Sequence, residues 1–258
     1  MQYQTLTVTQ AGGIVTLTLD RPEVMNALST QMRAELLDAV KEAGRTARVI
    51  VLTGAGRAFC SGQDLGDRAR VAQIDIERTL RDEYEPLLRA ITDCPVPVIA
   101  AVNGAAAGAG ASLALACDVV IAAESAVFIQ ALTRIALIPD AGGTYWLPRQ
   151  VGFARAMGAM LFAESISARQ AADWGMIWEA VADHAFADHV AARAGSLAAG
   201  PTVAYSAVKQ ALRASFTNDL GAQLSLEARL QGACGQTRDF KEGVVAFMDK
   251  RKPAFEGR

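Results

Sequence analysis

Residues 96–123 read VPVIAAVNGAAAGAGASLALACDVVIAA and decide the fold class of this chain. The pattern predicts a buried strand at 96–102, a loop of small residues at 104–110, a helix at 111–117 and another buried strand at 119–123. Strands that alternate with helices in this way are typical of α/β units with mostly parallel strand pairing.

The residues before this stretch continue the same alternation. Residues 5–9 and 14–19 alternate between polar and apolar side chains around Gly12 and Gly13, which predicts a hairpin of half-buried strands. Ser29 or Thr30 is a plausible cap for a helix whose apolar face contains Met32, Leu36, Leu37 and Val40. A short apolar strand is predicted at 48–53 and a second helical stripe at 76–91.

The residues after 142 are mainly helical. Helices are predicted at 154–163, 168–174, 185–198, 202–215, 223–234 and 240–250. We therefore interpret residues 1–195 as an α/β core and residues 196–258 as a C-terminal helical region.

Composition limits the classes of function. The 258 residues carry 25 basic and 27 acidic side chains and are 52% hydrophobic, which disfavours disorder and gives no bulk attraction for nucleic acid or for an anionic membrane. The first residues show no secretory signal, so we expect a cytoplasmic protein. Cys60, Cys94, Cys117 and Cys234 form no C-x-x-C pair, and no metal site is expected.

Two glycine-bearing segments are candidates for a binding site. Residues 58–65 end a strand in a turn that exposes backbone N–H groups, and residues 103–112 lead a strand into a helix N-terminus. Unpaired N–H groups and the positive end of a helix dipole suit an oxyanion. Tight packing of helix on sheet explains these glycines equally well, and both interpretations stay open.

Asp140 is a third candidate, because it lies among apolar residues immediately before Ala141, Gly142 and Gly143. Aspartate is a favoured residue at helix N-caps, so Asp140 is either a cap or a catalytic carboxylate.

Four segments together resemble the enoyl-CoA hydratase/isomerase (crotonase) superfamily. They are residues 21–29 (RPEVMNALS), 59–65 (FCSGQDL), 104–118 and 137–149, and residues 241–251 are similar to the C-terminal pattern of that family. The resemblance implies a crotonase-like ββα spiral core with a C-terminal helical trimerisation region, in a homotrimer or a hexamer.

The resemblance also implies a site for an acyl-CoA thioester, with no metal and no cofactor other than the coenzyme A of the substrate. The two backbone N–H groups that hold the thioester oxygen match Gln63 and Ala109. The matching substrate and CoA contacts are Val24, Met25, Ala27, Ser61, Gly62, Gln63, Asp64, Leu65, Gly66, Gly108, Ala109 and Lys252. We expect the acyl group to be lined by Ile129, Ala131, Leu132, Ile135 and Trp146.

Hydratases of the family use two glutamates, and here Ser112 and Leu132 occupy those two positions. Asp140 matches the acidic proton shuttle of several isomerases of the family. The resemblance therefore implies an isomerase acting on an enoyl-CoA or a ring-epoxide phenylacetyl-CoA thioester, in phenylacetate catabolism or fatty acid metabolism, with Asp140 as its single acid/base.

Three alternatives remain open. Enoyl-CoA hydration is the first. An aryl-CoA dehalogenase is the second, but it needs a histidine base, and no histidine precedes residue 184. A non-catalytic RNA-binding relative is the third, and it would require a basic stripe that this sequence lacks.

Overall fold

The computed structural model of the chain describes residues 3–66 and 75–258. Its larger sheet contains six strands in the order β1, β2, β3, β5, β7, β10. The bounds of these strands are β1 (Leu6–Ala11), β2 (Ile14–Leu19), β3 (Val49–Gly54), β5 (Val98–Val102), β7 (Val119–Ala123) and β10 (Glu179–Val181). β1 and β2 form the expected antiparallel hairpin, and every other pairing in this sheet is parallel.

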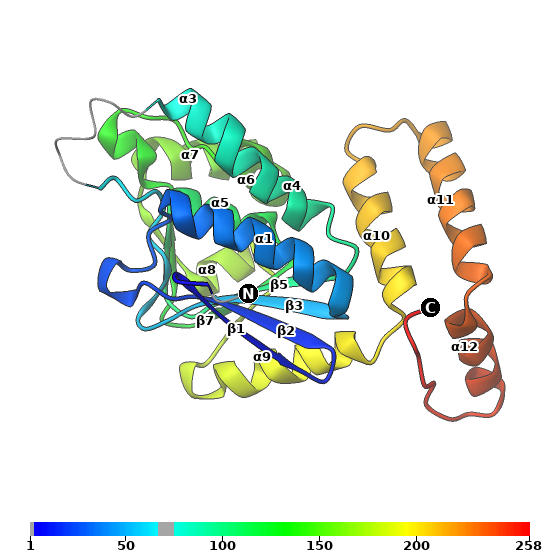
Figure 1. Ribbon diagram of the computed structural model, residues 1–258. Coiled ribbons are helices and arrows are strands. Elements are labelled where there is room, and N and C mark those ends of the chain that lie inside the picture. The colour runs from blue at the N-terminus through cyan, green and yellow to red at the C-terminus, as the bar shows by residue number, and fades with distance from the viewer. Residues whose placement is uncertain (1–2, 67–74) are drawn as a thin grey trace.

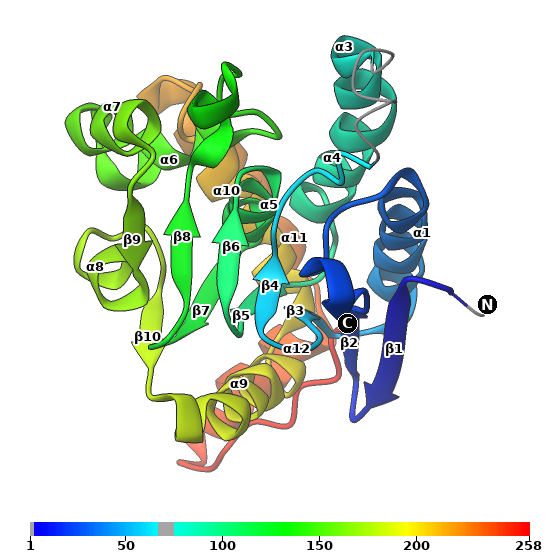
Figure 2. The same cartoon turned by 90° about the vertical axis from the view of Figure 1, so that its left-hand side faces the viewer.

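A smaller sheet contains four short strands in the order β4, β6, β8, β9. They are β4 (Ala58–Cys60), β6 (Ala105–Ala107), β8 (Val127–Ile129) and β9 (Ser165–Ser167). Figure 2 shows them side by side in front of the larger sheet. β3 is followed by β4, β5 by β6 and β7 by β8, so each turn of the chain gives one strand to each sheet before the next helix. This arrangement confirms the α/β class and the ββα spiral.

Eleven α-helices and three 3-10 or π-helical turns complete the described structure. The α-helices are α1 (Thr30–Thr46), α3 (Ile76–Thr79), α4 (Glu85–Thr92), α5 (Ala109–Ala116), α6 (Gly143–Val151), α7 (Phe153–Phe162), α8 (Ala168–Asp173), α9 (Asp183–Ala198), α10 (Thr202–Ala214), α11 (Leu220–Gly235) and α12 (Arg238–Met248). The turns are η1 (Pro22–Val24), the π-helical η2 (Leu80–Tyr84) and η3 (Ala131–Ile135). The predicted helices are all present, with ends that differ by a few residues.

The central strands are apolar on both faces because helices cover both faces of the sheet. In β3, Ile50 and Leu52 belong to the main core, which includes residues of α1, α4 and α5. Val49 and Val51 belong to a second core, which packs against Val190, Ala194 and Ala198 of α9. The continuous apolar run that predicted this strand reflects its burial on both faces.

The prediction of a small-residue loop at 104–110 is wrong for part of this segment. Residues 105–107 form β6, in which Ala106 pairs with Cys60 on one side and with Phe128 on the other. Alanine has a weak preference for strands, so the backbone pairing with two neighbouring strands decides this conformation.

The C-terminal helices α10, α11 and α12 stand apart from the spiral core (Figure 1). Two cations of α10 fasten them to it: Lys209 Nζ lies 2.7 Å from Asp118 Oδ2, and Arg213 Nη2 lies 2.7 Å from Asp118 Oδ1. The division at residue 195 stays a prediction. Residue 195 lies inside α9, which ends at Ala198, and α10 begins at Thr202. Among the described helices, none has the length and apolar composition needed to cross a membrane.

Candidate active site

The segments 24–28 and 61–66 lie against each other through backbone hydrogen bonds. The Leu28 N–H donates to the Gly62 carbonyl at 2.8 Å, and the Asp64 N–H donates to the Leu28 carbonyl at 3.2 Å. The Ser61 N–H donates to the Met25 carbonyl at 2.9 Å. The two segments that carry most of the expected CoA contacts therefore form one continuous surface.

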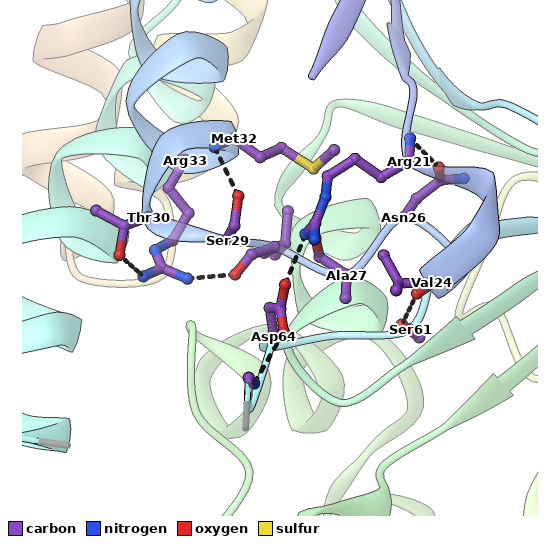
Figure 3. A network of polar contacts seen from close by, with 12 residues as sticks. Arg21, Val24, Asn26, Ala27, Ser29, Thr30, Met32, Arg33, Ser61 and Asp64 are labelled. Atoms are coloured by element: carbon purple, nitrogen blue, oxygen red, sulfur yellow. Dashed lines mark hydrogen bonds and ion pairs between the residues drawn. The ribbon is translucent and has the colours of Figure 1, made fainter. Parts of the chain in front are cut away.

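Side chains hold this surface in place (Figure 3). Arg21 Nη1 lies 2.7 Å from Asp64 Oδ2 and donates to the Ala27 carbonyl at 2.8 Å. Partial burial acts to raise the pKa of the Asp64 carboxyl. The hydrogen bonds from Arg21 and from the Gly66 N–H, together with the positive charge of Arg21, outweigh burial and keep that pKa below its usual value. Asp64 is consequently an ionised partner of Arg21, which suits a structural role better than proton transfer.

A second loop brings the N-terminus of α5 to the same place. Gly108 precedes this helix with φ +50°, a conformation that favours glycine, and Ala109 is the first helical residue. A Cβ atom added at Gly62 would lie 3.4 Å from the Ala109 nitrogen, so the two loops are in contact. Among the described residues, neither the Gln63 N–H nor the Ala109 N–H donates a hydrogen bond. Two free backbone donors therefore lie on neighbouring loops.

The contact between these loops depends on Gly110. A Cβ atom at this position would lie 2.3 Å from the Cys60 carbonyl oxygen and 2.8 Å from the Cys60 Cβ. Real side chains do not approach backbone oxygen so closely, so only glycine allows the helix start and the end of β4 to come together. The glycines of the two segments thus serve packing and site geometry at once.

Asp140 follows η3 and lies shortly before α6. The residue at the N-cap of α6 is Gly142, and no side chain donates or accepts a capping bond there. Asp140 Oδ1 is buried and has no hydrogen-bond partner among the described residues. The structure therefore contradicts the interpretation of Asp140 as a helix cap.

Burial raises the pKa of the Asp140 carboxyl above its usual value, and the carboxyl forms no ion pair among the described residues. Leaving a buried polar atom without a partner typically costs about 1–3 kcal/mol. Groups held at such a cost are concentrated at functional sites, where a shifted pKa serves proton transfer.

A pocket of about 620 Å³ opens beside Asp140. It lies between the 80–92 helical segment and the 138–146 segment. Glu85 carries the other carboxylate among its lining residues, but that side chain is 50% exposed and pairs with Arg89 at 2.8 Å. Asp140 is half-buried, and it is the carboxylate of this pocket whose Oδ1 is buried and has no partner among the described residues.

The residues at the two expected glutamate positions lie close to Gly108, in the loop that precedes α5. Ser112 is fully buried on α5, and its hydroxyl donates to the Gly108 carbonyl at 3.3 Å. Leu132 is 9% exposed, and its Cγ would lie 3.6 Å from a Cβ atom added at Gly108. The structure thus places a hydroxyl and a hydrocarbon at these two positions, and neither can act as a carboxylate base.

The other expected contacts are distributed unevenly. Val24 and Met25 are each 38% exposed and Leu65 is 45% exposed, so apolar side chains are accessible beside the loops. Of the expected acyl lining, Trp146 shares the pocket with Asp140, whereas Ile135 is 51% exposed.

Lys252 stays a prediction, because a single copy of the chain does not bring it to the other expected CoA contacts. The segment after α12 lies on the opposite side of the molecule from the loop at 61–66 (Figure 1). The C-terminal helices extend away from the core and carry Lys252 with them.

The sequence interpretation missed two residues of the site, Arg33 and Tyr84. Arg33 is 3% exposed, its Nη1 donates to the Leu28 carbonyl, and its guanidinium lies 4.9 Å from the centre of the Tyr84 ring. Figure 3 shows this guanidinium between Thr30 and the backbone next to Ala27. A signal was present, because Arg33 precedes Leu36 by three residues on the apolar face of α1.

Comparisons with known proteins agree with this geometry. The family model of enoyl-CoA hydratase/isomerase matches residues 9–258. The chain belongs to the enoyl-CoA hydratase/isomerase family.

Relatives in this family carry different activities in their names. A protein of Rhodobacter capsulatus named "Probable enoyl-CoA hydratase" is 63% identical over the full length of both chains. The 1,2-epoxyphenylacetyl-CoA isomerase of Escherichia coli is 47% identical over 95% of this chain and 96% of its own length. The solved structure of an enoyl-CoA hydratase from Bacillus anthracis superposes with a TM-score of 0.91 at 34% identity, covering 99% of this chain and all of the other.

Proposed function

We propose that this protein is an acyl-CoA isomerase, acting on an enoyl-CoA or a ring-epoxide phenylacetyl-CoA thioester, with Asp140 as its acid/base. One observation carries the proposal: Asp140 Oδ1 is buried and has no partner among the described residues, whereas Ser112 and Leu132 stand at the two expected glutamate positions. The likeness to the isomerase of Escherichia coli supports it. The name of the Rhodobacter capsulatus relative favours hydration as the second candidate.

The proposed reaction moves one proton within the substrate. The Asp140 carboxylate removes a proton from the carbon α or γ to the thioester carbonyl, and the electron pair of that C–H bond forms an enolate. The N–H groups of Gln63 and Ala109 hold the resulting negative charge on the thioester oxygen. The protonated Asp140 then returns the proton to the other carbon, and the double bond has shifted. A raised pKa favours the first step, because it makes the Asp140 carboxylate a stronger base.

The proposal is tested by incubating the protein with a 3-enoyl-CoA and with a ring-epoxide phenylacetyl-CoA and identifying the products by mass spectrometry and chromatography. Conversion of either thioester into an isomer of the same mass supports the proposal. A product that is heavier by one water molecule, formed at a comparable rate, favours hydration.

We expect little hydration of crotonyl-CoA. A positioned acid or base typically contributes about 10²–10⁴ in rate, and two such groups are missing here. Turnover of crotonyl-CoA should therefore lie at least about 10²-fold below that of a family member with both glutamates. The turnover of the two proteins is compared at saturating crotonyl-CoA, and equal turnover would contradict the isomerase assignment.

The raised pKa of Asp140 predicts a pH dependence. Burial raises this pKa above 3.8, and the base must be ionised to take a proton. Isomerisation should therefore fall at acid pH with a midpoint above that of an exposed aspartate, about 3.9. A profile of kcat/KM against pH measures this midpoint in the free enzyme, and a flat profile down to about pH 4 would contradict the assignment.

The same shift predicts a change in stability. Because the folded-state pKa is raised, the favourable contribution of protonated Asp140 is present below the unfolded-state pKa and is lost as the pH rises through the folded-state pKa. Asp140→Asn stays neutral, so it should be more stable than the parent at neutral pH and equally stable at about pH 3. Urea unfolding of both proteins at the two pH values tests the sign.

We also propose a homotrimeric or hexameric assembly in the cytoplasm, closed by the C-terminal helices. Val208, Leu212 and Leu224 are each more than half exposed on α10 and α11, whereas Leu226 is buried. Exposed apolar stripes of this kind are typical of subunit contacts. In such an assembly, Lys252 remains a candidate for CoA phosphates only where the C-terminal segment of one copy reaches the site of another.

A further inference from the structure

Tyr84 is the last residue of the π-helical turn η2, which interrupts the helical segment between α3 and α4. A π-helical turn adds one residue to the helix and is frequent at functional sites. Tyr84 is 2% exposed, and it lines the pocket beside Asp140. The extra residue of the π-helical turn therefore determines that Tyr84 lies on the side of the helix that faces the pocket.

Arg33 and its partners hold the Tyr84 ring. The Arg33 guanidinium lies 4.9 Å from the centre of the ring, and Arg33 Nε donates to Glu83 Oε2 at 2.9 Å. The same guanidinium donates to the Leu28 carbonyl, beside Gln63. The position of the ring is thus tied to that of the oxyanion loop.

The Tyr84 hydroxyl is an unused hydrogen-bond donor. This hydroxyl is buried and has no partner among the described residues. The indole N–H of Trp146, which lines the same pocket, is also buried and without a partner among those residues. Burial raises the pKa of the Tyr84 phenol, the Arg33 charge opposes this rise, and the Cys60 and Asp140 groups add to it. The phenol therefore stays protonated at neutral pH and able to donate.

A hydrocarbon acyl chain would leave both of these donors unpaired. A buried donor without an acceptor costs free energy, and a site built around such donors favours a ligand that supplies the acceptor. The Asp140 carboxylate lines the same pocket, but it must remain available to take the proton of the substrate.

We propose that the Tyr84 hydroxyl donates a hydrogen bond to an oxygen on the acyl group, so that the pocket selects oxygen-bearing acyl-CoA thioesters over hydrocarbon ones. The proposal rests on the proposed isomerase function and names the substrate class of the same site. Trp146 supplies the second donor of the pocket. Asp140 moves the proton while Tyr84 holds the oxygen.

The experiment measures the binding of two thioesters that differ by one atom. In 2-methoxyphenylacetyl-CoA an ether oxygen accepts a hydrogen bond, and in 2-ethylphenylacetyl-CoA a CH₂ group replaces that oxygen with nearly the same shape. Isothermal titration calorimetry gives the ratio of the two Kd values for the parent protein, Tyr84→Phe and a control, Tyr3→Phe. The Tyr3 hydroxyl donates to Asp38 Oδ2 at 2.8 Å on the surface, so its loss removes a phenol oxygen that is unrelated to the pocket.

We expect the parent and Tyr3→Phe to bind the methoxy compound about tenfold more tightly than the ethyl compound, the effect of one neutral hydrogen bond. Tyr84→Phe should lose most of this preference and keep its affinity for the ethyl compound. Because the hydroxyl has no partner among residues 3–66 and 75–258, its removal should not impair folding, which thermal unfolding checks. Trp146→Phe, which removes the second donor, should reduce the preference in part.

Three results would each overturn the proposal: an unchanged ratio in Tyr84→Phe, an equal loss of affinity for both compounds in that variant, or no preference in the parent. If the parent bound neither compound, the arylacetyl form of the proposal would be overturned. Isomerisation of a 3-enoyl-CoA by the parent is measured in parallel and involves no acyl oxygen. Turnover without the binding preference rejects the role of Tyr84 alone, and the preference without turnover rejects the isomerase function.

Discussion

Asp140→Asn is expected to lower isomerisation by at least about 10²-fold while folding and the binding of CoA thioesters remain intact. Asparagine has nearly the same size as aspartate, but its amide cannot take a proton from carbon and return it. The cap of α6 is Gly142, so the substitution removes no capping bond. Single-turnover isomerisation, calorimetric binding of a CoA thioester and urea unfolding together separate chemistry from binding and folding.

Asp173→Asn provides the matched control. Asp173 is an exposed aspartate at the end of α8, so the same change of charge there should leave turnover within about twofold. Near-normal turnover of a well-folded Asp140→Asn would mean that another group transfers the proton.

Gly110→Ala is expected to have the second large effect, because it forces the two oxyanion loops apart. The added Cβ would lie 2.3 Å from the Cys60 carbonyl oxygen, so the start of α5 must move and carry the Ala109 N–H with it. One such donor is typically worth about 10²–10³ in rate, and overpacking costs about 1–3 kcal/mol of stability. We expect kcat/KM to fall at least about 10²-fold, with a lower urea midpoint.

Gly195→Ala serves as the control for adding one methyl group at a helical glycine. Gly195 lies in α9, and nothing lies within 4 Å of an added Cβ. Alanine there should leave kcat/KM unchanged and stabilise the protein by about 0.5–1 kcal/mol. If Gly110→Ala retained parental kcat/KM, the apposition of the two loops would not be needed for the reaction.

The course of the chain was largely predictable from sequence. Residues 96–123 contain apolar runs separated by small residues, and such runs indicate buried strands and helices. The short strands were harder to predict. β6 and β9 contain three residues each, too few for a periodic pattern, and they exist because neighbouring strands offer backbone partners.

The site was predictable in part for the same reason. Asp140 was conspicuous as an acid among apolar residues, but a cap and a catalytic group give the same local pattern. The structure separates them, because Gly142 takes the cap and Asp140 Oδ1 stays unpaired. Tyr84 had no such signal, since an aromatic residue at helical spacing is normally part of the core.

The sequence by itself determined which chemical groups exist at the site: a carboxyl at 140, a hydroxyl at 112, a hydrocarbon at 132 and glycines at 62, 108 and 110. Only the tertiary structure decided which of them meet. Arg33 links the ring of Tyr84 to the carbonyl of Leu28, and the end of β4 touches the start of α5 at Gly110. The Arg33–Tyr84 and Cys60–Gly110 contacts join residues far apart in the chain, so no local pattern of side chains records them.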